Sequence, residues 1–152
     1  MKAFEEKWYE LQADMISICM EYVEDRADKV YVYASSEEGV TSGRFFYLIH
    51  DKLVECHKVN DALQSGEDRY DVSTNRMFEV LDVINNDIFS MRELCKEFGQ
   101  DMPTEIKLIY DTASGKLQGQ YKYELVYTHD DLKTASHIAD EWFEEVKANL
   151  GR

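Results

Sequence analysis

Prolines, glycines and long apolar runs are scarce in this sequence of 152 residues, and each scarcity excludes a class of protein. The seven glycines form neither a dinucleotide-binding fingerprint nor a Walker motif, so the usual phosphate-binding loops are missing. No apolar run approaches the roughly 20 residues of a membrane span, and the charged residues 1–6 are unlike a signal peptide. We therefore expect a cytoplasmic protein with no cofactor and no membrane partner.

Cysteine and histidine are also few, and neither forms a recognisable metal site. Cys19, Cys56 and Cys95 are far apart and lie within apolar patterns, which predicts buried free thiols in a reducing compartment. None of the four histidines belongs to an HExxH motif or to a paired cysteine spacing. Only His50 and His57 lie near a cysteine, and a partly exposed histidine beside a buried thiol explains that pattern. We assign no metal ligand.

The sequence contains no recognisable catalytic motif. A nucleophile elbow is missing, although sequence alone leaves open a triad assembled in space. Adjacent acids such as Asp130 and Asp131 are typical of solvated pairs in an acidic chain rather than of a glycosidase. We assign no catalytic residue and expect a protein that is not an enzyme.

The charge is strongly one-sided, because 31 acids against 17 bases give a formal net charge of −14. This negative field repels phosphates, so nucleic acid and anionic membranes are poor partners, whereas a basic protein would be attracted quickly. Solubility alone is the competing explanation, since net charge bears on solubility and association rather than on fold.

Three helices are predicted from apolar residues that recur at steps of three and four. The first covers residues 4–22, and the second carries a stripe from Met77 to Phe98 and ends at Gly99 in a left-handed cap. The third is buried through a stripe that includes Trp142. It begins after residues 128–131, which resemble a capping box.

Five strands are predicted from β-branched and aromatic segments. Residues 60–73, which have neither a helical nor a strand period, form a long loop. Polar and apolar residues alternate strictly over 117–127, which predicts a sheet with one face on the core and the other mainly in water. The predicted strands cover residues 29–34, 43–49, 53–59, 106–110 and 117–127.

Together these elements predict an α+β fold, a five-stranded antiparallel sheet with three helices in the order α-β-β-β-α-β-β-α, as one domain over residues 1–152. Tyr31 and Tyr33 share one face of the first strand. Either that strand is buried on both faces, or the tyrosine pair is exposed at a protein interface. The core between helices and sheet is predicted to contain Trp8, Leu11, Met15, Ile18, Leu81, Ile84, Ile88, Trp142 and Val146.

The order of elements and several short sequence segments resemble the YezG-like immunity protein family of bacterial antitoxins. These segments are the acidic helix over residues 4–22, the strands at 28–34, 43–47 and 121–123, Pro103 and the turn at 115–117. The resemblance implies a cytoplasmic protein that binds and blocks the toxic domain of a secreted toxin, often a nuclease.

Acids on the predicted exposed faces and loops are the candidate contacts with such a partner, which would itself carry a basic surface. The alternatives are a cytosolic adaptor or regulatory binding domain without a toxin, and an enzyme of unrecognised type. The candidate partner-binding residues are Glu6, Glu10, Glu37, Glu38, Glu67, Asp68, Asp140, Glu141 and Glu144.

Overall fold

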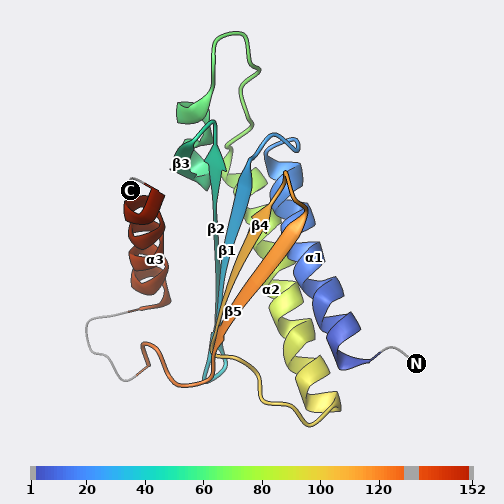
Figure 1. Cartoon of the computed structure of the whole chain (residues 1–152). Coiled ribbons are helices and arrows are strands. Elements are labelled where there is room, and N and C mark those ends of the chain that lie inside the picture. Colours follow the sequence, from blue (N-terminus) through green and yellow to red (C-terminus); the bar gives the residue numbers. More distant parts are fainter. Residues whose placement is uncertain (1–2, 129–133, 151–152) are drawn as a thin grey trace.

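The computed structural model describes residues 3–128 and 134–150, and it has the predicted order of helices and strands (Figure 1). The elements are α1 (Phe4–Tyr22), β1 (Lys29–Glu37), β2 (Val40–Ile49), β3 (Lys52–Glu55), η1 (Cys56–Ala62), α2 (Thr74–Glu97), β4 (Glu105–Asp111), β5 (Lys116–Lys122) and α3 (Ala135–Leu150). The short 3-10 helix η1 adds a fourth helical segment to the predicted three. The sheet is antiparallel throughout, with the strand order β3-β2-β1-β4-β5.

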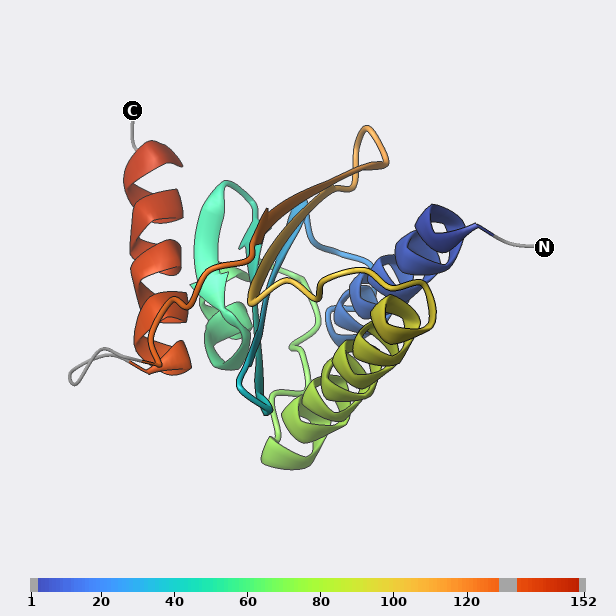
Figure 2. The same cartoon turned by 90° about the horizontal axis from the view of Figure 1, so that it is seen from below.

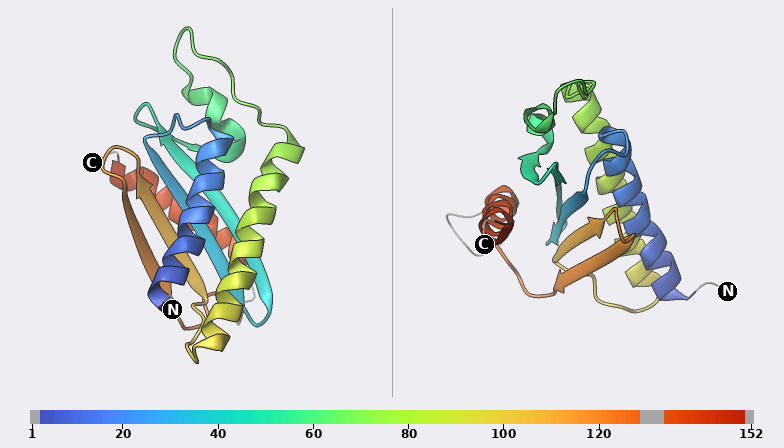
Figure 3. Two further views of the ribbon diagram at one scale, coloured as in Figure 1. Left: turned by 90° about the vertical axis from the view of Figure 1, so that its right-hand side faces the viewer. Right: turned by 45° about the horizontal axis from the view of Figure 1, so that its top comes forward.

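Helices cover the sheet on both faces. α1 and α2 lie side by side across one face, and α3 packs on the opposite face (Figures 2 and 3). The expectation of a sheet covered mainly on one side is therefore wrong. Its physical reason lies in the central strands, which present apolar side chains to both layers: Val32 points to the α1–α2 side, whereas Tyr31 packs with Trp142 of α3.

Tyr31 and Tyr33 are buried beneath α3, at 3% and 1% exposure, so the interface interpretation of this pair is wrong and burial on both faces is correct. The ring of Tyr31 stacks on Phe46 with a centroid separation of 4.8 Å. Tyr33 Oη donates a hydrogen bond to Glu105 Oε2 at 2.8 Å, so its polar end is satisfied within this second core.

The predicted core residues divide between the two layers. Met15, Ile84 and Ile88 are buried between the helix pair and the sheet, as predicted. Trp142 is buried and Val146 partly buried between a helix and the sheet, as predicted, but they belong to a second core, which lies under α3 on the opposite face of the sheet. The partly buried residues around the main core include Trp8, Leu11, Ile18 and Leu81.

Strand β3 ends at Glu55, four residues earlier than predicted, and the chain turns into η1. Tyr22 Oη donates to the carbonyl oxygen of Cys56 at 2.9 Å, which ties this backbone to α1 instead of to a neighbouring strand. Val59 still reaches the main core with no exposed surface. The following loop is closed by Asn60, whose side chain exchanges two hydrogen bonds with the backbone of Tyr70.

Strand β5 ends at Lys122 rather than at residue 127, because the backbone N–H groups of residues 126–128 donate hydrogen bonds to the Glu37 carboxylate at the end of β1 instead of to a neighbouring strand. Most of the predicted capping box, residues 129–131, lies outside the described residues. The described helix α3 begins at Ala135. Thr134 caps it, since its Oγ1 accepts from the His137 N–H and its own N–H donates to His137 Nδ1.

Gly99 ends α2 as predicted, with a φ of 65°, and the N–H groups of Gly99 and Gln100 bond back to the last turn. The three cysteines are free thiols; Cys19 and Cys95 are buried and Cys56 is partly buried. Across residues 3–128 and 134–150, no helix is both long and apolar enough to cross a membrane.

Candidate partner-binding site

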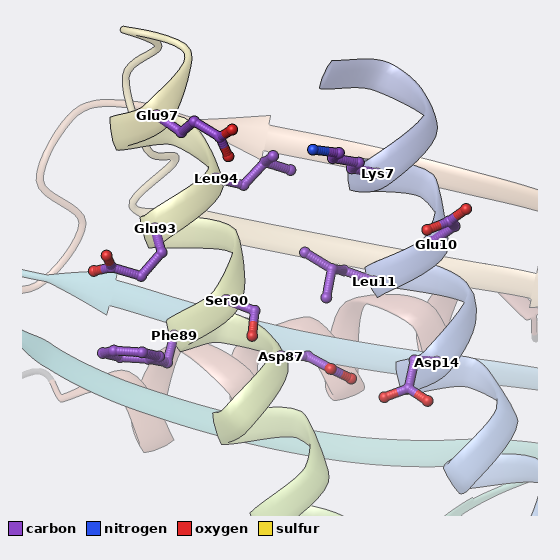
Figure 4. Close-up of a pocket in the computed structure, with 10 residues that line it drawn as sticks. All are labelled: Lys7, Glu10, Leu11, Asp14, Asp87, Phe89, Ser90, Glu93, Leu94 and Glu97. Carbon is purple, nitrogen blue, oxygen red and sulfur yellow. The ribbon is translucent and has the colours of Figure 1, made fainter. Parts of the chain in front are cut away.

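A groove of about 700 Å³ runs between α1 and α2 on the outer surface of the helix layer (Figure 4). It is lined by five carboxyl groups and one amine, so its charge is negative even relative to the rest of this acidic chain. Three apolar side chains and Ser90 contribute the remaining surface, with Phe89 exposed at 60% on the rim. The lining residues are Lys7, Glu10, Leu11, Asp14, Asp87, Phe89, Ser90, Glu93, Leu94 and Glu97.

Helical spacing explains why these side chains meet. On α1 the residues Lys7, Glu10 and Asp14 follow one another at steps of three and four, so they lie on one side of the helix. On α2 the residues Asp87 and Leu94 are seven positions apart, two turns on the same side. The groove therefore has one wall from each helix, and the main core lies beneath both.

Asp87 and Asp14 form the centre of the groove. Their carboxyl groups extend toward one another from α2 and α1 (Figure 4), and the Asp14 carboxyl is near enough to contribute to the raised pKa of Asp87. Asp14 is exposed, whereas Asp87 is only 7% exposed, and its Oδ2 atom is buried without a hydrogen-bond partner. Two carboxyl groups this close form a hydrogen bond only when one of them carries a proton.

Burial of the Asp87 side chain, together with the neighbouring Asp14 carboxyl, raises the pKa of Asp87 to about 8. At neutral pH the pair therefore holds one proton between its two carboxyl groups. The groove is in consequence a protonated acid pair surrounded by further carboxylates, a site that can accept hydrogen bonds from a cation once that proton leaves.

Of the nine candidate contacts, only Glu10 lines the groove, and Glu6 is exposed on the same helix one turn away. Glu38 is exposed in the turn between β1 and β2. Glu67 is occupied within its own loop, where its carboxylate accepts from the Gln64 N–H at 2.7 Å and lies 2.9 Å from His50 Nε2. The adjacent Asp68 is exposed, and its carbonyl oxygen accepts a hydrogen bond from Arg26.

The remaining acids on α3 lie on the opposite face of the sheet from the groove. Asp140, Glu141 and Glu144 are all exposed. Asp140 forms a salt bridge with Arg44 of β2 and so helps to hold α3 on the sheet. The structure therefore places Glu6 and Glu10 on one side of the sheet and the three α3 acids on the other, so a single flat partner surface cannot contact both groups together.

Glu37 is not on the surface, and the prediction that it offers an exposed charge is wrong. Its side chain is 1% exposed and accepts hydrogen bonds from the N–H groups of Val126, Tyr127 and Thr128 and from Thr128 Oγ1. Burial alone would raise the pKa of Glu37, but these four hydrogen bonds outweigh that effect and lower it. The carboxylate anchors the segment that leads toward α3.

Sequence reasoning missed Asp14, Asp87, Glu93 and Glu97. A signal for Asp87 exists, because it lies three residues after Ile84 and four before Met91, within the buried stripe of α2. An acid in the middle of an apolar stripe is costly unless it is paired, and so it marks a position to examine. Asp14, Glu93 and Glu97 look like any other acid on a solvated helix face.

Within residues 3–128 and 134–150 the structure shows neither a cluster of metal-binding side chains nor an activated thiol. No cluster of three or more His, Cys, Asp or Glu side chains there could hold one metal ion. Burial is the main cause that raises the pKa of the Cys56 thiol to about 11, and burial also raises the pKa of Cys19 and Cys95. All three thiols are therefore poor nucleophiles at neutral pH.

One of two comparisons places the chain in a known protein family. A comparison with curated protein sequences finds no match. The family model described as "Immunity protein YezG-like" matches residues 5–146, which is nearly the whole chain and includes both walls of the groove. The resemblance seen in the strand and helix segments of the sequence is thereby confirmed, and the chain belongs to the YezG-like immunity protein family.

Proposed function

We propose that this chain binds the toxic domain of a cognate secreted bacterial toxin in the cytoplasm and blocks it by occupying its surface, without catalysing a reaction. In this proposal residues 1–152 act as one domain. The family supplies the general kind of function, an immunity protein. The chemistry of the partner is inferred from this chain's own charge: a toxin domain with a basic surface, such as a nuclease, suits it best.

The acidic groove between α1 and α2 is the observation that carries the proposal. Five carboxyl groups line it against the single amine of Lys7. The exposed ring of Phe89 on its rim adds apolar surface of the kind that anchors protein interfaces. A basic protein surface pressed into this groove would meet both opposite charge and an apolar contact.

The net charge of −14 acts at longer range than the groove itself. It accelerates the encounter with a basic partner, and salt weakens this steering over a Debye length of about 8 Å at physiological ionic strength. Association that slows as salt rises is therefore expected. An association rate that does not change from low to high salt would contradict a steered encounter.

Co-expression tests the function directly. An immunity gene is expected to adjoin the gene of its toxin, so the probe is the toxin domain that such a neighbouring gene encodes, produced in bacterial cells with and without the chain. Growth only in the presence of the chain, together with a complex of the two purified proteins, is the expected result. A toxin domain that kills equally in both cells would reject neutralisation, and a non-toxic bound partner would point to an adaptor instead.

Charge reversal then distinguishes the two acidic sides of the molecule. Replacing Glu6 and Glu10 by lysine alters the groove side, and replacing Glu144 and Glu145 by lysine alters α3 by the same amount of charge. We expect the first pair to slow association with the toxin domain more than the second. The reverse order would move the docking surface to α3.

A further inference from the structure

The Asp14–Asp87 pair is a built polar site rather than two acids on a helix surface. Asp87 is more than nine-tenths buried, lines the groove, and keeps one carboxyl oxygen without any hydrogen-bond partner. A buried acceptor left without a donor lowers stability, and an aliphatic residue at this position would continue the stripe of Ile84 and Met91. The buried Asp87 carboxyl therefore lowers the stability of the free protein, and a hydrogen-bond donor supplied by a partner would remove this cost.

We infer that Asp14 and Asp87 together receive one arginine or lysine side chain of the toxin domain. The arriving cation then displaces the proton that the two carboxyl groups share in the free protein. This inference rests on the proposed function, since it names the contact through which the toxin domain would be held. The displaced proton passes to solvent, and the two carboxylates then share one positive charge.

The groove fits a basic side chain better than a metal ion. A guanidinium group donates in a planar fork that matches two carboxylates, and the aliphatic stem of arginine or lysine would pack on Leu11 and Leu94. The resident amine, Lys7, lies over the ring of Phe98 at 5.6 Å from its centroid. A metal would need at least three ligands, and the described residues offer no such group here.

The charged groups around the pair account for its proton. From α1 the groove presents Lys7, Glu10 and Asp14, and from α2 it presents Glu93 and Glu97 near Asp87. The sheet beneath contributes residues of β1 and β2 that are apolar apart from Tyr47, whose hydroxyl donates to the carbonyl oxygen of Cys19. Asp14 is the charged group that raises the pKa of Asp87, so a cation placed between the two would reverse that effect.

Binding should consequently release one proton. Between pH 5 and 7 the affinity for the toxin domain should rise roughly tenfold per pH unit, because Asp87 is protonated in the free protein and ionised in the complex. Asp87→Asn removes this linkage without changing the net charge of the free protein at neutral pH. The variant should leave the association rate nearly unchanged and raise the dissociation rate, weakening binding by about ten- to a hundredfold.

The experiment measures both rates for the toxin domain with the wild-type chain, with Asp87→Asn and with Asp82→Asn, across pH 5 to 8. Asp82 is an exposed acid on the same helix outside the groove, so its variant matches the chemical change and should keep the pH dependence. Equal dissociation rates for Asp87→Asn and wild type would overturn the inference. If the wild-type chain and Asp87→Asn both still neutralised the toxin domain, the proposed function would remain supported.

A second probe keeps the inference testable if the wild-type chain fails to neutralise the toxin and the proposed function falls. A blocked tetra-arginine peptide is titrated into the chain labelled with ¹³C at aspartate carboxyl carbons. We expect the peptide to lower the pKa of Asp87, whereas the carboxyl signal of Asp82 should not respond to the peptide. No change at the pair would overturn the inference, and so would a shift produced by Mg²⁺ but not by the peptide.

Discussion

Glu37 Oε1 accepts a hydrogen bond from Thr128 Oγ1 at 2.6 Å, across 91 residues of sequence. The same carboxylate accepts three backbone N–H groups, so one buried side chain at the end of β1 holds the segment that follows β5. The stability of the α3 side of the molecule therefore depends on the carboxylate of Glu37, which lies in the hairpin of β1 and β2.

Replacing Glu37 by Gln should lower the free energy of unfolding at pH 7 by about 2 kcal/mol, because a neutral amide oxygen is a weaker acceptor for several donors. Its neighbour Glu38 is exposed, and Glu38→Gln serves as the control with little expected effect. Since the folded pKa of Glu37 is lowered from its ordinary value of 4.5, its contribution is present above that pH and is lost as the pH falls. Urea unfolding at a series of pH values from 7 downward measures both effects; a difference between wild type and Glu37→Gln that stays the same size throughout this acidification would argue against the anchor.

Asp87 should give the opposite pH dependence. Its pKa is raised from 3.8 to about 8 in the folded chain, so the folded state holds the proton more tightly and stability is lost as the pH rises between these values. At pH 9 the buried carboxylate is ionised, and Asp87→Asn should then be more stable than wild type by about 1–3 kcal/mol. Thermal unfolding from pH 4 to pH 9 tests this, with Asp82→Asn as the control; identical curves for wild type and Asp87→Asn would refute it.

Trp142 should be the main anchor of α3. It is 4% exposed, and its ring lies 5.1 Å from the centroid of Phe46 and 5.9 Å from that of Tyr31. Trp142→Ala should cost about 3–5 kcal/mol in the free energy of unfolding. Leu150 is 44% exposed on the same helix, and Leu150→Ala provides the control. An unchanged denaturation midpoint for Trp142→Ala would contradict the packing of α3 on the sheet.

The thiols should be structural. Replacing Cys19, Cys56 and Cys95 together by alanine should lower the free energy of unfolding by about 1–3 kcal/mol and leave the affinity for the toxin domain nearly unchanged. Burial raises the pKa of each thiol, so iodoacetamide at pH 7.5 should modify the native protein far more slowly than the urea-unfolded chain. Stoichiometric zinc in the purified protein, lost on the triple substitution, would refute this role.

The elements could be predicted from sequence because their signals are local. The stripe of α2, the cap at Gly99 and the alternation of Val30, Tyr31 and Val32 each reflect a helical or strand period. No comparable local pattern in the sequence indicates which face of the sheet a helix will cover. The stripe around Trp142 shows that α3 is amphipathic, but nothing in that stripe distinguishes one face of the sheet from the other.

The candidate site was harder to predict for the same reason. Glu37 lies in a hairpin beside Glu38 and Gly39, where an acid is usually solvated, and the backbone groups that bury it are about 90 residues away. Those groups are main-chain N–H donors, which leave no trace in the sequence. Asp87 differs, because its place in a buried stripe could have been noticed, although its partner Asp14 could be found only in the structure.

Strand β5 lies at one edge of the sheet, and its residues from Lys116 to Lys122 are mostly exposed. Two copies meeting at this edge could extend their sheets through backbone hydrogen bonds, the usual route to strand-mediated aggregation. At neutral pH the charge of −14 keeps copies apart, but mild acidification neutralises that repulsion and leaves the edge available. The acids thus also govern colloidal stability, and concentrated protein should precipitate first near its isoelectric pH.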